Sequence, residues 1–185
     1  MEFQKFDIEG IVLCKPKIIV DERGFFAETF RKDLLEEFIS NKITFCQQNT
    51  SKSSFGVLRG LHFQDLPFSQ TKLISVSNGE ILDVVVDLRK QSSTFSQVFS
   101  ILLNDKNNFQ LLIPKGFAHG FIVTTKEAKI NYQVDSYYKK NYELGINPFD
   151  EALNIDWKID RKEIVCNSRD LNWPTIEDID KNLKF

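Results

Sequence analysis

The chain has 185 residues, of which 42% are hydrophobic and 27% are charged, and its formal net charge is −2. This length and composition are typical of one globular domain with a buried core. The charge excludes a broad basic surface for nucleic acid, and no apolar stretch approaches the roughly 20 residues of a membrane span. We therefore expect one domain over 1–185, ending in a tail at 175–185, with no nucleic-acid or membrane partner.

The number and spacing of the cysteines indicate the redox state of the cellular compartment. Cys14, Cys46 and Cys166 are scattered, with no C-x-x-C spacing between them. An odd and sparse set indicates reduced thiols rather than a disulfide framework. The first residues also lack the pattern of a signal peptide. Together these features predict a cytoplasmic protein.

One clear helix is expected in the first third of the chain. The segment "RKDLLEEFISN" (31–41) places Leu34, Leu35 and Phe38 on one face, which is the spacing of an amphipathic helix. A second, short helix is expected in "TIEDIDKNLKF" (175–185), after Pro174. The helices are therefore additions to a fold made of other elements.

Most of the chain reads as strands. Short runs rich in Val, Ile and Phe occupy 10–20, 72–88, 96–114 and 120–138. The Asn-Gly pair of "SNGE" (77–80) predicts a hairpin between the runs on either side of it. "NDKNN" (104–108) and "TTKEAK" (124–129) predict further turns. Strands at roughly ten-residue spacing are typical of a β-sandwich or barrel.

Both histidines lie in apolar runs that also contain glycine and aromatic residues. His62 belongs to "FGVLRGLHFQ" (55–64) and His119 to "LLIPKGFAHGF" (111–121). A histidine in such a run can be a core residue. It is also the side chain whose unperturbed pKa best suits a general base near neutral pH. Taken singly, each histidine leaves both interpretations open.

Five segments, in order along the chain, resemble the dTDP-4-dehydrorhamnose 3,5-epimerase family. They are "DERGFFAETFR" (21–31), "QQNTSKSSFGVLRGLHFQ" (47–64), "KLISVSNGEILDVVVDLR" (72–89), "IPKGFAHGF" (113–121) and "YQVDSYYKKNYELGI" (132–146). The resemblance implies a mainly β fold, a jelly-roll or cupin-like double-sheet sandwich with short helical additions. It also implies a homodimer with strand exchange. The implied reaction needs no metal and no cofactor, and inverts C3, C5 or both in a nucleotide-diphosphate-linked 4-keto-6-deoxy sugar.

The resemblance assigns four catalytic residues. His62 is the base and Asp170 the carboxylate that orients it, while Lys72 stabilises the enolate oxygen and Tyr132 donates a proton on the opposite face. These residue types suit the reaction, because a ketone acidifies the hydrogens on both neighbouring carbons. Removing such a hydrogen needs a base near pH 7 and a positive group for the enolate, and inversion needs an acid on the other face.

Further residues follow from the same resemblance. His119 and Asp83 match a second histidine–carboxylate pair that supports the site; Asp83 stands in an apolar run, where an unpaired carboxylate would be costly. Guanidinium groups suit a diphosphate, and aromatic and amide groups suit a nucleotide base. The expected substrate-binding residues are Arg23 and Arg59 for the phosphates, Phe26, Glu28, Gln47 and Asn49 for the base, in part from the neighbouring subunit, and Tyr138 for the sugar or base.

Other functions stay open at this point. "QQNTS" (47–51), "LPFSQTKL" (66–73, with a bulky Phe68) and "NPFDEALNIDW" (147–157) depart from the usual family pattern around the nucleotide and sugar. A GDP-linked 4-keto-6-deoxyheptose, or inversion at C3 only or C5 only, is an alternative. A metal-dependent cupin is less favoured, because two histidines cannot supply its three. A non-catalytic sugar-binding jelly roll would not need His62, Lys72 and Tyr132 together.

Overall fold

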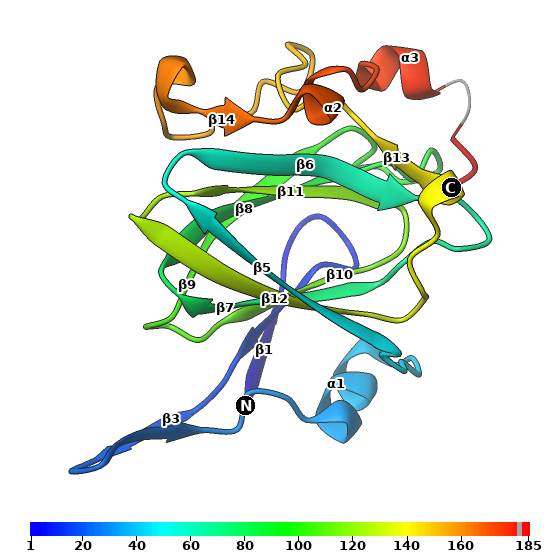
Figure 1. Ribbon diagram of the computed structural model, residues 1–185. Helices are drawn as coiled ribbons and strands as arrows, with labels where there is room; N and C mark the ends of the chain where they lie inside the picture. The colour runs from blue at the N-terminus through cyan, green and yellow to red at the C-terminus, as the bar shows by residue number, and fades with distance from the viewer. Residues whose placement is uncertain (181–182) are drawn as a thin grey trace.

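The computed structural model describes residues 1–180 and 183–185, and two large sheets dominate it (Figure 1). The first sheet has the order β1 (Glu2–Lys5), β2 (Val12–Lys15), β10 (Gln110–Ile113), β7 (Lys72–Asn78), β12 (Glu127–Val134), β5 (Gln47–Ser54). The second sheet has the order β13 (Glu143–Gly145), β6 (Val57–Gln64), β11 (Phe117–Val123), β8 (Glu80–Asp87), β9 (Val98–Asn104), with β14 (Val165–Cys166) parallel to β6.

The main core lies between these sheets. Alternate residues of each strand point inward, so that Ile74 and Ile130 of the first sheet meet Ile81 and Val85 of the second. All four are fully buried, as strand periodicity requires when two sheets pack face to face. The expected mainly β, jelly-roll double-sheet sandwich is confirmed.

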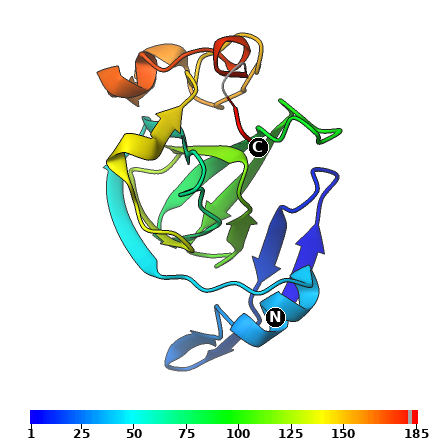
Figure 2. The same ribbon diagram turned by 90° about the vertical axis from the view of Figure 1, so that its right-hand side faces the viewer.

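A different segment of the chain covers the outer face of each sheet (Figure 2). Helix α1 (Lys32–Ile39) packs against the first sheet through Leu35, which is buried. The segment after β13 covers the second sheet and contains η2 (Arg161–Glu163), α2 (Ser168–Leu171) and α3 (Ile176–Asp180). The helix expected over 31–41 is thus confirmed with shorter bounds. The tail helix is confirmed up to residue 180, whereas residues 181–182 lie outside the described part.

The expected hairpin at "SNGE" is wrong. Strands β7 and β8 are separated by Gly79 alone, yet they belong to different sheets and do not pair. Gly79 has φ +75°, and a Cβ there would lie 2.0 Å from the carbonyl oxygen of Glu127. Its N–H donates to the Asp105 carboxylate at 2.7 Å. The turn is therefore a tight corner that passes the chain from one sheet to the other.

A two-stranded hairpin stands apart from both sheets. It consists of β3 (Ile18–Asp21) and β4 (Gly24–Ala27), and it projects from the lower end of the molecule in Figure 1. No helix in the described part of the chain is long and apolar enough to cross a membrane. The remaining short element, η1 (Lys140–Tyr142), precedes β13.

Candidate active site

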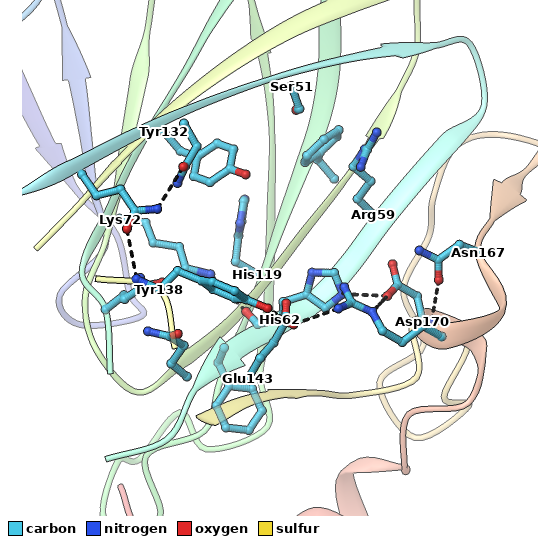
Figure 3. A pocket seen from close by; sticks show the side chains of 17 residues that line it. Ser51, Arg59, His62, Lys72, His119, Tyr132, Tyr138, Glu143, Asn167 and Asp170 are labelled. Carbon is cyan, nitrogen blue, oxygen red and sulfur yellow. Dashed lines mark hydrogen bonds and ion pairs between the residues drawn. The ribbon is translucent and has the colours of Figure 1, made fainter. Parts of the chain in front are cut away.

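A cavity of about 380 Å³ opens between the two sheets (Figure 3). This volume suits a small-molecule ligand. Strands β5, β7 and β12 of the first sheet, strands β6, β11 and β13 of the second, and α2 contribute its walls. The lining residues are Gln47, Asn49, Ser51, Arg59, His62, Phe63, Gln64, Gln70, Lys72, His119, Phe121, Tyr132, Tyr138, Glu143, Asn167, Arg169 and Asp170.

A bulge in β6 brings Arg59 and His62 to the same pocket. Residues three apart on a regular strand point to opposite faces. Here His119 and Phe121, two apart on β11, pair with His62 and Arg59, so that β6 contains one extra residue. Gly60 permits the irregularity with φ +132°, because a Cβ there would lie 2.5 Å from Gly120 Cα. The bulge therefore aims both side chains into the cavity.

His62 is paired with Asp170, as expected. Its Nε2 lies 2.7 Å from Asp170 Oδ1, and the other carboxylate oxygen accepts the N–H of Gly60 at 3.2 Å. Burial opposes ionisation of Asp170, but these two hydrogen bonds and the charges of His62 and Arg169 lower the pKa of the carboxyl. An ionised Asp170 accepts a hydrogen bond from Nε2–H, so that the proton stays on Nε2 and the free lone pair of the neutral ring is on His62 Nδ1.

Lys72 lies at the start of β7, beside the histidine. Its Nζ donates to the backbone oxygen of His62 at 3.2 Å. Burial lowers the pKa of Lys72 to about 8, although the nearby charges of Asp83 and Glu143 favour the ammonium. The side chain is therefore a cation that water stabilises poorly and that a new negative charge in the cavity would stabilise.

Tyr132 comes from β12 of the first sheet, the same sheet as Lys72 and the one opposite His62. In the ladders of β12 it pairs with Asn49 and Ile74, which places it in the wall formed by the first sheet. Figure 3 shows Tyr132 and Lys72 on one side of the pocket and His62 and Asp170 on the other. Burial raises the pKa of Tyr132, an effect that Glu143 adds to and Arg59 opposes. Its phenol therefore keeps its proton at neutral pH.

The second predicted pair is also formed. His119 Nε2 lies 3.0 and 3.1 Å from the two carboxylate oxygens of Asp83. Asp83 is completely buried behind the cavity wall, whereas His119 lines the cavity. The histidine thus explains how the apolar strand β8 tolerates a carboxylate.

Four predicted substrate-binding residues line the same cavity. Arg59 donates its Nε proton to Ser53 at 3.1 Å, which orients the guanidinium. Gln47 bonds to Asn49 Oδ1 at 2.9 Å and accepts the backbone N–H of Tyr138 at 3.0 Å. The amide of Gln47 is therefore engaged within the chain.

Three predicted binding residues lie elsewhere. Arg23, Phe26 and Glu28 belong to the projecting hairpin or directly follow it, and none lines the cavity of its own chain. Arg23 bonds to Asp21, and Glu28 lies 3.6 Å from Arg31. Within one chain, the structure does not bring these residues to the site.

Sequence reasoning missed two charged residues of the pocket. Glu143 Oε2 accepts the Tyr138 hydroxyl and Arg169 Nη1, both at 2.8 Å. Arg169 Nη2 also lies 3.5 Å from His62 Nε2. Arg169 directly precedes Asp170, and this adjacency was the available signal. Phe68, a departure from the family pattern, packs edge-on against Tyr142 and is not among the lining residues.

A metal site would need several ligands close together. Across residues 1–180 and 183–185, no three His, Cys, Asp or Glu side chains gather in a way that could hold a metal ion. The two histidines are directed to separate carboxylates.

Comparisons with known proteins agree with this geometry. A family model described as dTDP-4-dehydrorhamnose 3,5-epimerase matches residues 5–178. The enzyme of that name from Shigella flexneri is 41% identical over 180 residues, covering 97% of this chain and 98% of the relative.

Solved structures extend the comparison. The dTDP-4-dehydrorhamnose 3,5-epimerase of Elizabethkingia anophelis superimposes with a TM-score of 0.93 at 38% identity, covering 96% of this chain and 97% of that one. An epimerase from Legionella pneumophila, solved in complex with dTDP-4-keto-L-rhamnose, gives a TM-score of 0.90 at 39% identity, covering 95% and 93%. With its fold, its paired histidines and these matches over nearly its whole length, the chain belongs to the dTDP-4-dehydrorhamnose 3,5-epimerase family.

Proposed function

We propose that the cavity binds a dTDP-linked 4-keto-6-deoxy sugar and that the protein inverts its C3 and C5 carbons by removing and returning protons through an enolate. The observation that carries this proposal is the His62–Asp170 pair at 2.7 Å, which faces Tyr132 across the cavity between the sheets. Inversion at a carbon acid needs such an arrangement, because the proton leaves from one face and returns to the other.

His62 Nδ1 is the proposed base atom. Nε2 is directed to Asp170, and Nδ1 makes no hydrogen bond to any residue in the described part of the chain. When Nδ1 takes a proton from the sugar, the imidazolium that forms lies against an ionised carboxylate. Asp170 thereby holds the tautomer and stabilises the charged intermediate without taking the proton itself.

Lys72 and Tyr132 complete the proposed proton transfers. Negative charge develops on the ketone oxygen as the hydrogen leaves, and a buried ammonium near that oxygen stabilises it more than an exposed one would. Tyr132 then delivers its proton to the opposite face of the planar enolate. Asp83, behind His119, helps to keep Lys72 charged.

The diphosphate is proposed to bind near Arg59. Its guanidinium is oriented by Ser53, and the hydroxyl of Ser51 lines the same cavity with no hydrogen-bond partner among the described residues. An arginine beside a free hydroxyl donor suits a phosphate oxygen. Arg169 contributes a second positive charge to the cavity wall.

The working form is proposed to be a homodimer whose sites are shared between chains. The projecting hairpin exposes Ile19, Val20, Phe25 and Phe26, each by more than half of its surface. Two strands alone are marginally stable in water, and an exposed apolar cluster is typical of an interaction surface. A second copy that covers this hairpin would receive Arg23, Phe26 and Glu28 at its own cavity, where the base is expected.

The proposed compartment is the cytoplasm. Cys14, Cys46 and Cys166 are all free thiols in the structure. A reducing compartment maintains thiols in that state.

The test is incubation of the protein in D₂O with 4-keto-6-deoxy sugars linked to dTDP, GDP or CDP, including a GDP-linked heptose. We expect deuterium at both C3 and C5 of the dTDP-linked hexose, together with the inverted product. Label at one carbon would replace the proposal with a single-centre epimerase. Turnover of the GDP-linked heptose alone would identify another substrate, and no label in any sugar would indicate a binding protein.

A further inference from the structure

The segment that follows β12 is held in place by glutamine side chains. Residues 135–139 form neither helix nor strand, so their backbone groups need other hydrogen-bond partners. Four consecutive residues obtain these partners from side-chain amides that line the cavity. Two backbone carbonyls accept from amide nitrogens: Ser136 O from Gln70 at 2.7 Å and Tyr137 O from Gln64 at 3.3 Å. Two backbone N–H groups donate to amide oxygens: Tyr138 to Gln47 at 3.0 Å and Lys139 to Gln64 at 2.6 Å. We call Gln47, Gln64 and Gln70 the glutamine clasp.

Gln64 is the central member of the clasp. The residue is 3% exposed, and its Nε2 also donates to Phe68 O at 2.7 Å. One amide thus bridges the loop after β6 and the segment after β12, using its donor and its acceptor together. Among side chains of this length, glutamine is the one that has both a hydrogen-bond donor and an acceptor and stays uncharged at every pH.

The clasped segment presents Tyr138 to the cavity. The tyrosine lines the cavity, its backbone N–H is fixed by Gln47, and its hydroxyl donates to Glu143 at 2.8 Å. The residue is nevertheless 47% exposed, so apolar packing alone does not fix it. The position of this aromatic wall therefore depends on the amide hydrogen bonds behind it.

We propose that Gln64 is a positioning residue: through the glutamine clasp it holds the 135–139 segment so that Tyr138 forms a ready-made wall for the substrate. The proposal rests on the proposed function of the cavity. A wall that is already ordered binds without the entropy cost of ordering it. Loss of the clasp should therefore weaken substrate binding more than it slows the proton transfers of His62 and Tyr132.

A double-mutant cycle tests this directly. Gln64→Met keeps the length of the side chain but removes its donor and acceptor. With dTDP-4-keto-6-deoxyglucose we expect KM to rise about tenfold while kcat changes less than about threefold. Adding Gln64→Met to Tyr138→Ala should raise KM less than twofold further, because the wall is already gone. If Gln64→Met raises KM by the same factor in wild type and in Tyr138→Ala, the proposal is overturned.

Trypsin provides a readout that is independent of turnover. Lys139 and Lys140 are exposed and lie at the end of the clasped segment, so cleavage there reports how often the segment opens. Well below the melting temperature, Gln64→Met should be cut several-fold faster than wild type. Gln133→Ala is the matched control, since it removes a surface amide bond to Gln48 outside the cavity. Its cleavage rate and KM should equal those of wild type.

A second variant keeps the test decisive if Gln64→Met does not fold. Gln64→Glu keeps the acceptor for Lys139 N and loses the donor toward Phe68 and Tyr137 when ionised. Faster cleavage than wild type is expected, and an unchanged rate contradicts the clasp. If wild type turns over no dTDP-linked sugar, the proposed function fails, while the cleavage rates still decide whether Gln64 holds the segment.

Discussion

His62 and His119 are direct cross-strand neighbours, paired in the antiparallel ladder of β6 and β11. Each nevertheless directs its Nε2 to a different carboxylate, Asp170 at 2.7 Å and Asp83 at 3.0 Å. The first pair lies partly open to the cavity, with 23% of the His62 side chain exposed, and the second is buried to 10% exposure at the histidine. Neighbouring residues of one type thus have different surroundings.

This difference predicts that the same substitution affects mainly activity at His62 and mainly stability at His119. His62→Asn should reduce epimerisation and deuterium exchange by about 10²–10⁴-fold, since the proposed general base is lost. It should lower the melting temperature less than His119→Asn does, because Asp170 keeps the Gly60 N–H and the Arg169 guanidinium as partners. His119→Asn should destabilise the fold by about 1–3 kcal/mol, because the shorter amide leaves the Asp83 carboxylate poorly paired. Exchange rates and thermal unfolding of both variants check this. Activity of His62→Asn within tenfold of wild type would rule out its role as the base.

Tyr132→Phe separates the acid from the base. The ring remains, but the proton for the opposite face is gone, while His62 can still remove a proton and return it on its own side. Exchange of deuterium without inversion should therefore persist after net epimerisation has fallen. The measurement compares label incorporation with product stereochemistry in one reaction. If both fall by the same factor, Tyr132 is not the opposite-face acid.

The sequence predicted where the strands lie better than it predicted which strands pair in a sheet. Apolar runs, turn residues and the 31–41 helix were all identified from local patterns. The error at "SNGE" arose because a turn signal shows where the chain reverses, not which sheet it enters next. Gly79 sends β8 across the sandwich, and this depends on its contacts with Asp105 and Glu127, which lie far away along the chain.

The site residues also divide into those that the sequence identified and those whose arrangement depends on the tertiary structure. The resemblance identified His62 and Asp170, which lie 108 residues apart. Simple strand alternation would have separated Arg59 from His62, and only the bulge at Gly60 unites them. Gln64 was visible at the end of "RGLHFQ", but its role depends on a segment without regular structure, whose path no periodic pattern encodes.

Lys72 predicts the alkaline side of the pH profile. Its ammonium is the form proposed to stabilise the enolate. Because its pKa is lowered to about 8, this form is present below pH 8 and is lost as the pH rises above it. The exchange rate at low substrate concentration, which reports kcat/KM and therefore the free enzyme, should fall above about pH 8. Tyr132 does not account for this fall, since burial raises the pKa of its phenol.

Lys72→Arg is the matched control for that assignment. A guanidinium stays charged throughout this range, so the alkaline fall should move to higher pH even if the rate itself is lower. An unchanged midpoint in the arginine variant would assign the titration to another group.

The last prediction concerns the sharing of sites between subunits. The side chain of Arg23 is 82% exposed and bonds to Asp21 within its own hairpin. Arg23 does not line the cavity of its own chain. If it serves the partner's cavity, Arg23→Ala chains and His62→Ala chains should each be nearly inactive alone. A mixed dimer should contain one site that escapes both lesions, because the intact His62 and the intact Arg23 then meet in the same cavity. Random pairing of coexpressed chains should restore about one quarter of the wild-type activity. The matched control pairs His62→Ala with Tyr132→Phe, two residues of one cavity, and should restore nothing. If the first mixture stays as inactive as its parents, or if light scattering finds a monomer at micromolar concentration, each chain works with its own residues alone and the shared site is wrong.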